Sequence, residues 1–169
     1  MKKVILLGKG SVTRDAFLAE IETGQYTVYT LNDGPQYLPK NLHKYITHHF
    51  DLHDGRCSTV NLGHASKFIK FVHWNNPGCD GVQFPLGQVL NRFNLDIKHL
   101  TSTFTYMLLY AMYCNNTEIL IAGLDYDTVS DRQIEELPGI MYLLGYANAL
   151  GIKITLPEHS FLRKSKFYN

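Results

Sequence analysis

Short runs of apolar, β-branched and aromatic residues recur along this chain, and glycine, proline, asparagine or aspartate bounds most of them. Runs that are apolar at successive positions are typical of strands buried on both faces of a parallel sheet. Six strands are predicted on this basis, at residues 3–7, 26–31, 45–52, 67–74, 118–122 and 153–156. The run at 67–74 is also compatible with a helix.

Apolar residues at helical spacing lie between several of these runs. The clearest helix is predicted at residues 102–114. Its apolar face consists of Phe104, Met107, Leu108 and Ala111. A second long helix is predicted at 131–150, before the stop signal Gly151. Shorter helices are predicted at 13–21 and 86–93.

Strands and helices alternate along the chain, which is typical of an α/β domain. The predicted architecture has three layers and is Rossmann-like, with a mostly parallel sheet and helices on both of its faces. The chain has 169 residues, with no internal repeat, linker or low-complexity segment. It is therefore predicted to form a single domain over residues 1–169.

The composition is that of an ordinary globular protein, with 45% hydrophobic and 18% charged residues and a formal net charge of +1. Because this net charge is small, it gives no overall electric field that would attract nucleic acid or a membrane surface. Recognition of a ligand is therefore expected at a local site. No apolar run approaches the roughly 18 residues of a membrane span, and the first run is too short for a signal peptide. These features predict a cytoplasmic protein, and its 11 tyrosines would suit a homo-oligomer.

The three cysteines, Cys57, Cys79 and Cys114, are odd in number and widely spaced. This spacing argues against a disulfide scaffold and against a zinc knuckle, and it indicates a reducing compartment.

A glycine-containing turn, Gly8-Lys9-Gly10-Ser11, joins the first predicted strand to the first helix. Glycines let backbone N–H groups approach a phosphate, and a helix N-terminus favours an anion. Lys9 or Ser11 can add a contact. The third glycine of a complete dinucleotide fingerprint would fall at Thr13, so a phosphate cradle and a plain tight turn both remain open.

Two further polar segments are expected at the same edge of the sheet, because ligands bind beyond the carboxyl ends of parallel strands. Asn32 and Asp33 end the second strand, where Asn32 can bond a ribose or a base, or simply form a turn. Thr101, Ser102 and Thr103 begin the long helix, where they can bind an anion or only cap the helix.

Titratable residues cluster at the end of the third predicted strand. Alternation along a strand puts His49, Asp51 and His53 on one face and His48 on the other. This group can be read as a general-base site, as a metal site, or as polar residues lining a pocket. Asp125, which follows the strand at 118–122, can bind a hydroxyl group or a cation such as Mg²⁺, or be solvated.

These motifs together resemble the bacterial lipooligosaccharide sialyltransferases and the related Rossmann-like group that includes hydroxymethylpterin diphosphokinases. The resemblance is carried by MKKVILLGKGS and by LTSTFTYMLLYAMYCNNTEILIAGLDY. Other segments, LNDGPQYLP, HHFDLHDG and GYANALGIKITLPEHSFL, resemble phage-encoded members of the group. The resemblance implies a phage protein whose Rossmann-like domain binds a nucleotide or nucleotide sugar.

By this resemblance, Gly8 and Gly10 would cradle the phosphates and Asn32 would touch the sugar or base. Ser102 and Thr103 would line the same cleft, with Asp125 and Tyr126 at its rim. The chain departs from the sialyltransferases at Lys9, where they carry Asn, and it lacks their long lid with its histidine base.

Three functions are compatible with these features. The first is a glycosyl- or phosphoryl-transferase that acts on a nucleotide or nucleotide sugar, with Asp51, His53 or Asp125 as acid or base. The second is a non-catalytic protein that sequesters a nucleotide signal of host defence. The third is a structural or interaction protein with an empty cleft.

Overall fold

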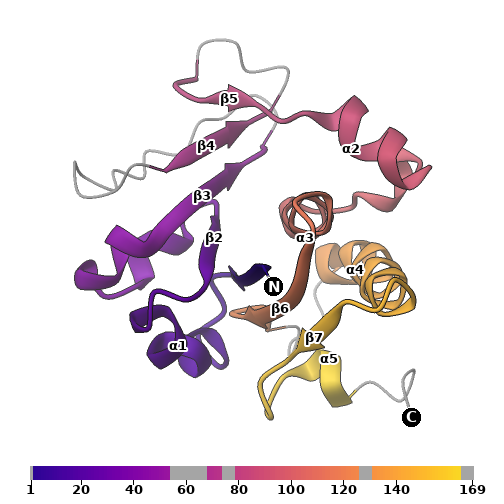
Figure 1. Ribbon diagram of the computed structural model, residues 1–169. Helices are drawn as coiled ribbons and strands as arrows, with labels where there is room; N and C mark the ends of the chain where they lie inside the picture. Colours follow the sequence, from indigo (N-terminus) through magenta and orange to yellow (C-terminus); the bar gives the residue numbers. More distant parts are fainter. Residues whose placement is uncertain (1, 54–67, 74–78, 126–130, 165–169) are drawn as a thin grey trace.

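The computed structural model describes residues 2–53, 68–73, 79–125 and 131–164. Seven strands form one sheet, in the order β5-β4-β3-β2-β1-β6-β7, and every neighbouring pair is parallel (Figure 1). The strands are β1 (Lys2–Leu7), β2 (Thr27–Leu31), β3 (Ile46–Asp51), β4 (Ile69–Val72), β5 (Val82–Gln83), β6 (Asn116–Ala122) and β7 (Lys153–Thr155). The six predicted strands are confirmed, and the run predicted at 67–74 contains the strand β4 rather than a helix.

Helices and, within the described residues, four short 3-10 segments lie between these strands, and one further helix follows the last strand. The α-helices are α1 (Leu18–Glu22), α2 (Leu86–Phe93), α3 (Thr103–Tyr113), α4 (Asp131–Ala149) and α5 (Phe161–Lys164). The 3-10 segments are η1 (Arg14–Phe17), η2 (Gly34–Tyr37), η3 (Lys40–Tyr45) and η5 (Ile97–His99). In Figure 1, α1 lies on one side of the sheet and α3 and α4 on the other, which confirms the three-layer α/β architecture.

Two apolar cores, one on each face, follow from the alternation of side chains along buried strands. In β1, Val4 and Leu6 face the core beneath α3 and α4, whereas Ile5 and Leu7 face the core on the α1 side. All four are at most 1% exposed. The continuous apolar run at the start of the chain is therefore the central strand of a sheet that is covered on both faces.

Several parts of the fold differ from the predicted elements, and three of these differences have a clear local cause. The helix predicted at 13–21 is divided into η1 and α1, because Phe17 leaves helical angles (φ −121°, ψ 25°). Strand β5 was not predicted, since it consists of two exposed residues with no apolar run. The connection between β2 and β3 contains η2 and η3, whose short 3-10 turns carry no extended periodicity.

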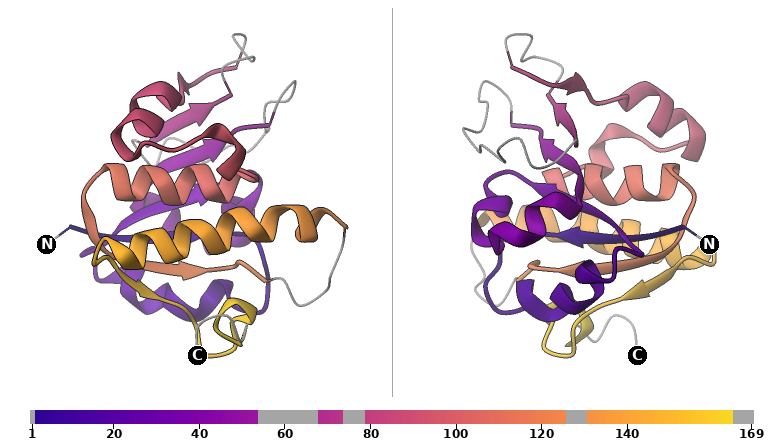
Figure 2. Two further views of the ribbon diagram at one scale, coloured as in Figure 1. Left: turned by 90° about the vertical axis from the view of Figure 1, so that its right-hand side faces the viewer. Right: turned by 60° about the vertical axis from the view of Figure 1, so that its left-hand side comes forward.

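The order of the strands places a switch point at β1. The chain proceeds outward from β1 through β2, β3 and β4 to β5, and then returns to the opposite side of β1 as β6. The loops that follow β1 and β6 therefore lie side by side where the strand order reverses, which is where open parallel sheets bind ligands. Figure 2 shows α3 and α4 packed side by side along the face that leads to this edge.

Two further observations bear on expectations from the sequence. Among the residues described, no helix combines the length and the apolar character that a membrane span requires. Cys79 is disulfide-bonded, whereas Cys114 is a free thiol. The cysteine spacing argued against a disulfide scaffold, and it did not predict the bond at Cys79, because spacing along the chain does not reveal which sulfurs meet in space.

Candidate functional site

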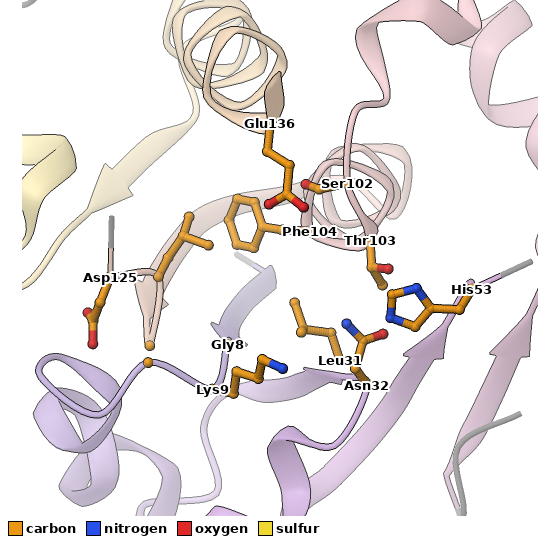
Figure 3. A pocket seen from close by; sticks show the side chains of 13 residues that line it. Gly8, Lys9, Leu31, Asn32, His53, Ser102, Thr103, Phe104, Asp125 and Glu136 are labelled. Atoms are coloured by element: carbon orange, nitrogen blue, oxygen red, sulfur yellow. The ribbon is translucent and has the colours of Figure 1, made fainter. Parts of the chain in front are cut away.

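A cavity of about 360 Å³ opens at the switch point, between the carboxyl ends of the central strands, the first turn of α3 and Glu136 of α4 (Figure 3). We call it the first lobe. It is lined by Gly8, Lys9, Gly10, Leu31, Asn32, His53, Ser102, Thr103, Phe104, Gly123, Leu124, Asp125 and Glu136. The ends of β1, β2, β3 and β6 and the start of α3, all predicted to contribute, therefore meet in one cleft.

A second lobe of about 280 Å³ adjoins the first. The two lobes share His53, Ser102, Thr103 and Glu136 as lining residues. The second lobe is otherwise lined by Leu52, His73, Leu100, Thr101, Tyr106 and Glu135. The cleft is therefore continuous around the N-terminus of α3, and the shared residues stand at its centre.

The glycines of the loop after β1 allow two loops to pack closely together. The amide of Gly8 donates to the carbonyl of Ala122 at 2.8 Å, and the amide of Gly10 donates to the carbonyl of Gly123 at 2.8 Å. A Cβ atom on Gly8 would lie 2.1 Å from the Gly123 carbonyl oxygen, and one on Gly123 would lie 2.6 Å from the Gly8 carbonyl oxygen. These contacts account for glycine at both positions without any ligand.

The carboxylate of Asp125 is bound by the same loop. Its Oδ2 accepts hydrogen bonds from the amides of Val12 at 2.6 Å and Thr13 at 3.3 Å, and its Oδ1 accepts from Thr13 Oγ1 at 2.5 Å. Thr13 Oγ1 in turn accepts from the amide of Gly123 at 2.9 Å. A Cβ atom on Gly10 would come within 2.5 Å of Asp125 Oδ2. Asp125 therefore fills the position that a phosphate would take in a glycine loop.

Lys9 connects this loop with the end of β2. Its Nζ lies 3.3 Å from Asp33 Oδ1, and its side chain is 58% exposed. Asp33 does not line either lobe; its other oxygen accepts hydrogen bonds from Gln36 and Tyr37. In Figure 3 the Lys9 side chain extends along the cleft toward Asn32. Lys9 thus supplies a positive charge to the first lobe, whereas Ser11 is exposed and lines neither lobe.

Among the residues that the structure describes, two that line the first lobe have a buried side-chain atom without a hydrogen-bond partner. One is Oδ1 of Asn32, a half-buried residue in the left-handed region at φ 48°. The other is Oγ of Ser102, the N-cap of α3. Ser102 and Thr105 have the arrangement of a capping box, in which Thr105 Oγ1 accepts from the Ser102 amide at 3.1 Å. The Thr105 amide donates to the Ser102 carbonyl at 3.0 Å, so its approach to Ser102 Oγ is too loose for a hydrogen bond. Buried polar atoms without a partner are rare in folded proteins and call for an explanation, such as a water molecule, an ion or a bound ligand.

Glu136 lines both lobes and was not predicted from the sequence. The carbonyl of Glu136 accepts a hydrogen bond from Thr101 Oγ1 at 2.8 Å, which ties α4 to the segment before α3. Gly139 permits this approach, because a Cβ atom there would lie 2.4 Å from Thr101 Oγ1 and 2.7 Å from the His99 carbonyl oxygen. Glu136 precedes the buried residues Ile140, Leu143 and Ala147 at helical spacing. Glu136 could have been found from the sequence, because it continues the helical spacing of these buried apolar residues and so lies on the face of α4 that packs against the sheet.

The titratable cluster at the end of β3 is divided between the two faces of the sheet. Asp51 is 1% exposed, lies 3.7 Å from Lys70 Nζ, and lines neither lobe of the cleft. His49 is close enough to Asp51 to feel its charge, as alternation predicted, and packs against Phe68 on the α1 side. The prediction that His53 shares this face is wrong, because β3 ends at Asp51 and His53 follows in the loop that lines the cleft.

No group of three or more potential metal ligands occurs among the residues that the structure describes. The metal interpretation of the histidine cluster therefore gains no support from those residues. Tyr126, predicted at the rim of the cleft, lies outside the described residues.

Burial of the two strand histidines predicts a dependence of stability on pH. Desolvation lowers the pKa of His48 and of His49 from near 6.5 to about 4. Between these values the unfolded chain binds protons that the folded chain does not, so the free energy of unfolding falls as the pH is lowered from about 6.5 toward 4. Urea unfolding at several pH values would measure this slope. His48 packs between the rings of Tyr29 and Phe71, so phenylalanine can replace it without loss of packing. His48→Phe should lower by one the number of protons taken up on unfolding, and so reduce the slope. An unchanged slope would contradict the assignment.

Comparison with known proteins leaves the family of the chain open. No protein-family model matches the chain, and no significant match to a curated protein or to a solved structure was found. The fold of this chain is therefore established by its own sheet topology, and the resemblance to sialyltransferases and diphosphokinases stays an expectation from sequence motifs.

Proposed function

We propose that this chain binds a nucleotide or a nucleotide sugar in the two-lobed cleft. The observation that carries the proposal is the pair of buried, unpartnered polar atoms, Asn32 Oδ1 and Ser102 Oγ, in a cavity at the switch point of a parallel sheet. Clefts at this position in open α/β sheets are the usual place for nucleotides. An apolar floor of Leu31, Phe104 and Leu124 supports the same class of ligand, which needs both polar and apolar contacts.

The phosphate is proposed to lie at the N-terminus of α3 rather than in the glycine loop. In that loop the amides of Gly10, Val12 and Thr13 already bond to the chain itself. In α3, by contrast, the first-turn amides of Thr103 and Phe104 have no acceptor within the helix by their position. The helix dipole and the Ser102 hydroxyl favour an anion there, and Lys9 lies across the same lobe.

The positions of Asp51 and Asp125, the two carboxylates predicted as catalytic acid or base, favour a protein that binds a nucleotide without catalysis. Asp51 is paired with Lys70 outside the cleft, and the carboxylate of Asp125 is held by the loop after β1. Neither carboxylate is therefore placed as an acid or base for a bound nucleotide. A protein that sequesters a nucleotide needs no such group.

A transferase is the second candidate, and the observation that favours it is the position of His53 and Glu136. Both residues line both lobes, so both would adjoin a ligand that spans the cleft. An imidazole and a carboxylate are the usual groups for proton transfer at a reacting bond. Glu136→Gln should then abolish turnover of a nucleotide or nucleotide sugar with little change in its Kd. Turnover equal to that of the unmodified protein would exclude this role.

The proposed phosphate contact predicts a specific loss of affinity on removing Lys9. Calorimetric titration with ADP, GDP, CDP, UDP and UDP-glucose would identify the ligand class, and native mass spectrometry of untreated protein would detect a carried-through nucleotide. Lys9→Ala should weaken the tightest of these about five- to tenfold, the loss of one charged contact near the surface.

Lys153→Ala is the matched control for this variant. Lys153 is also an exposed lysine in an ion pair, with Glu118, but it lies on β7 and lines neither lobe. Its replacement should leave the affinity unchanged. Binding of none of these nucleotides, or equal weakening by both variants, would contradict the proposal.

A further inference from the structure

The outer helix α4 has no charged residue beyond its first two turns. Its charged residues all lie within 131–136, whereas the segment 137–150 has none and carries polar side chains only at two tyrosines and Asn148. One side of this segment packs into the core through Ile140 and Leu143, which are fully buried. An outer helix usually turns charged and polar residues to solvent, whereas a helix that is apolar all round is usually buried on all sides. The free side of α4 is therefore expected to be covered by a partner.

Five residues at every fourth position form an apolar stripe on that free side. We call them the α4 stripe: Ile134, Pro138, Tyr142, Tyr146 and Leu150, the last directly after the helix. Ile134, Tyr142 and Leu150 are 56%, 43% and 51% exposed, Pro138 is exposed, and Tyr146 is half-buried. The left view of Figure 2 shows α4 in front, with no other described helix or strand across it. A contiguous, exposed apolar surface of this kind marks an interaction site.

Stacked rings hold the middle of the α4 stripe in place. The ring of Tyr142 lies between those of His99, with centroids 4.3 Å apart and planes at 18°, and Tyr146, with centroids 6.2 Å apart and planes at 7°. The hydroxyl of Tyr146 donates to the carbonyl of Phe93 at 3.2 Å. Because both tyrosines are already fixed in the single chain, little side-chain entropy is lost when a partner covers them.

Charged groups of opposite sign stand toward the two ends of the α4 stripe. Glu135, which is exposed, follows Ile134 at one end. Arg92, also exposed, lies toward the other end, because its guanidinium is 5.8 Å from the centre of the Phe93 ring, which is 6.1 Å from that of Tyr146. A complementary partner therefore carries a base opposite the first end, an acid opposite the second, and apolar surface between them.

A second copy of α4, running in the antiparallel direction, meets these requirements. The α4 stripe is centred on Tyr142, with Ile134 eight residues before it and Leu150 eight residues after it. An antiparallel copy therefore sets apolar residues against apolar residues along the whole stripe, and it brings Glu135 to the end where Arg92 of the partner subunit lies. Rows of residues at a spacing of four are the ridges used in the commonest class of helix packing.

We infer that two copies of this chain form a two-fold symmetric dimer through antiparallel α4 helices. Two-fold dimers are the commonest oligomers of soluble proteins. The dimer does not depend on nucleotide binding, since no residue of the α4 stripe lines either lobe of the cleft. Glu136 reaches the cleft from the start of α4, so antiparallel helices place the two clefts toward opposite ends of the dimer. A contact based on one helix face is small, and we expect a dimer Kd of about 1–100 μM.

Sedimentation velocity of the full chain without ligand tests the dimer, and it should show a monomer–dimer equilibrium between about 1 and 200 μM. Tyr142→Arg sets two like charges against each other at the centre of the contact and should raise the dimer Kd at least about tenfold. Tyr37→Arg is the matched control, because Tyr37 is 46% exposed and packs on Arg14 rather than on α4. It should leave the dimer Kd unchanged, and thermal unfolding followed by circular dichroism would show that both variants are folded.

Reversal of the two end charges tests the antiparallel direction and leaves the apolar residues in place. Glu135→Arg and Arg92→Glu should each raise the dimer Kd about two- to fivefold, and the double variant should restore it, because the pair forms again with its charges exchanged. A chain that stays monomeric over the whole range, even if it binds a different protein through α4, overturns the inference. Equal dimer Kd values for Tyr142→Arg and Tyr37→Arg also overturn it. A dimer that the double variant does not restore overturns the antiparallel pairing.

Discussion

Gly8→Ala is expected to destabilise the protein by at least about 3 kcal/mol, a large part of the stability of a typical domain. The added Cβ atom would lie 2.1 Å from the carbonyl oxygen of Gly123 and 2.8 Å from its carbonyl carbon. Both atoms belong to backbone that is fixed by the hydrogen bonds from Gly8 to Ala122 and from Gly10 to Gly123. Neither loop can move away without breaking these bonds, so the clash is not relieved by a side-chain rotation. Urea unfolding measures the loss.

Gly87→Ala provides the control for the same chemical change. Gly87 lies in α2, and a Cβ atom there would meet nothing within 4 Å. Alanine is the better helix former, so this variant should be as stable as the unmodified protein or more stable by up to about 1 kcal/mol. Gly123→Ala, at φ 69°, should resemble Gly8→Ala. Equal stability of Gly8→Ala and Gly87→Ala would refute the close packing of the two loops.

Asp125→Ala is expected to cost about 3 kcal/mol of stability, although Asp125 lies at the edge of the cleft. The substitution removes the acceptor for the amides of Val12 and Thr13 and for the Thr13 hydroxyl. Hydrogen bonds to a charged group contribute more than neutral ones, and an amide left without an acceptor carries a further cost. Asp125→Asn, which keeps one oxygen, should lose about half as much. Unfolding in urea, with circular dichroism as the signal, measures both values.

A double-mutant cycle with Thr13→Val distinguishes a structural role of Asp125, which holds the two loops together, from a catalytic role. Thr13 Oγ1 donates to Asp125 and accepts from the amide of Gly123, so the two side chains act as one unit. Their coupling energy should be at least about 1 kcal/mol. If Asp125→Ala is as stable as the unmodified protein, the carboxylate does not hold the two loops together, and Asp125 becomes a candidate acid of the cleft again.

Much of the candidate site could be predicted because strand ends in a parallel sheet converge. The loops at Gly8, Asn32 and Asp125 each follow an apolar run, and the structure brings all three to the first lobe together with Ser102. The role of the loop after β1 could not be predicted in the same way. Its glycines suggested a cradle for phosphate, but Asp125, more than a hundred residues away along the chain, occupies its amides.

Glu136 and Asp51 show why the remaining assignments needed the structure. Alternation correctly paired Asp51 with His49, but it does not say which face of β3 adjoins the cleft. Glu136 reaches the cleft only because Gly139 lets α4 approach Thr101 and the segment before α3. Each of these placements depends on how two distant elements pack.

The sequence by itself determined the fold class and the edge of the sheet at which the candidate cleft lies. Apolar runs such as Lys3–Leu7 are local signals, since burial of both faces of a strand requires apolar residues at successive positions. Only the tertiary structure decided which polar groups are used within the chain and which face the cleft. It assigned Asp125 to the loop after β1 and left Ser102 and Asn32 with unpartnered atoms. The physical reason is that hydrogen-bond partners are chosen by sheet order and packing, which bring together residues that no local pattern connects.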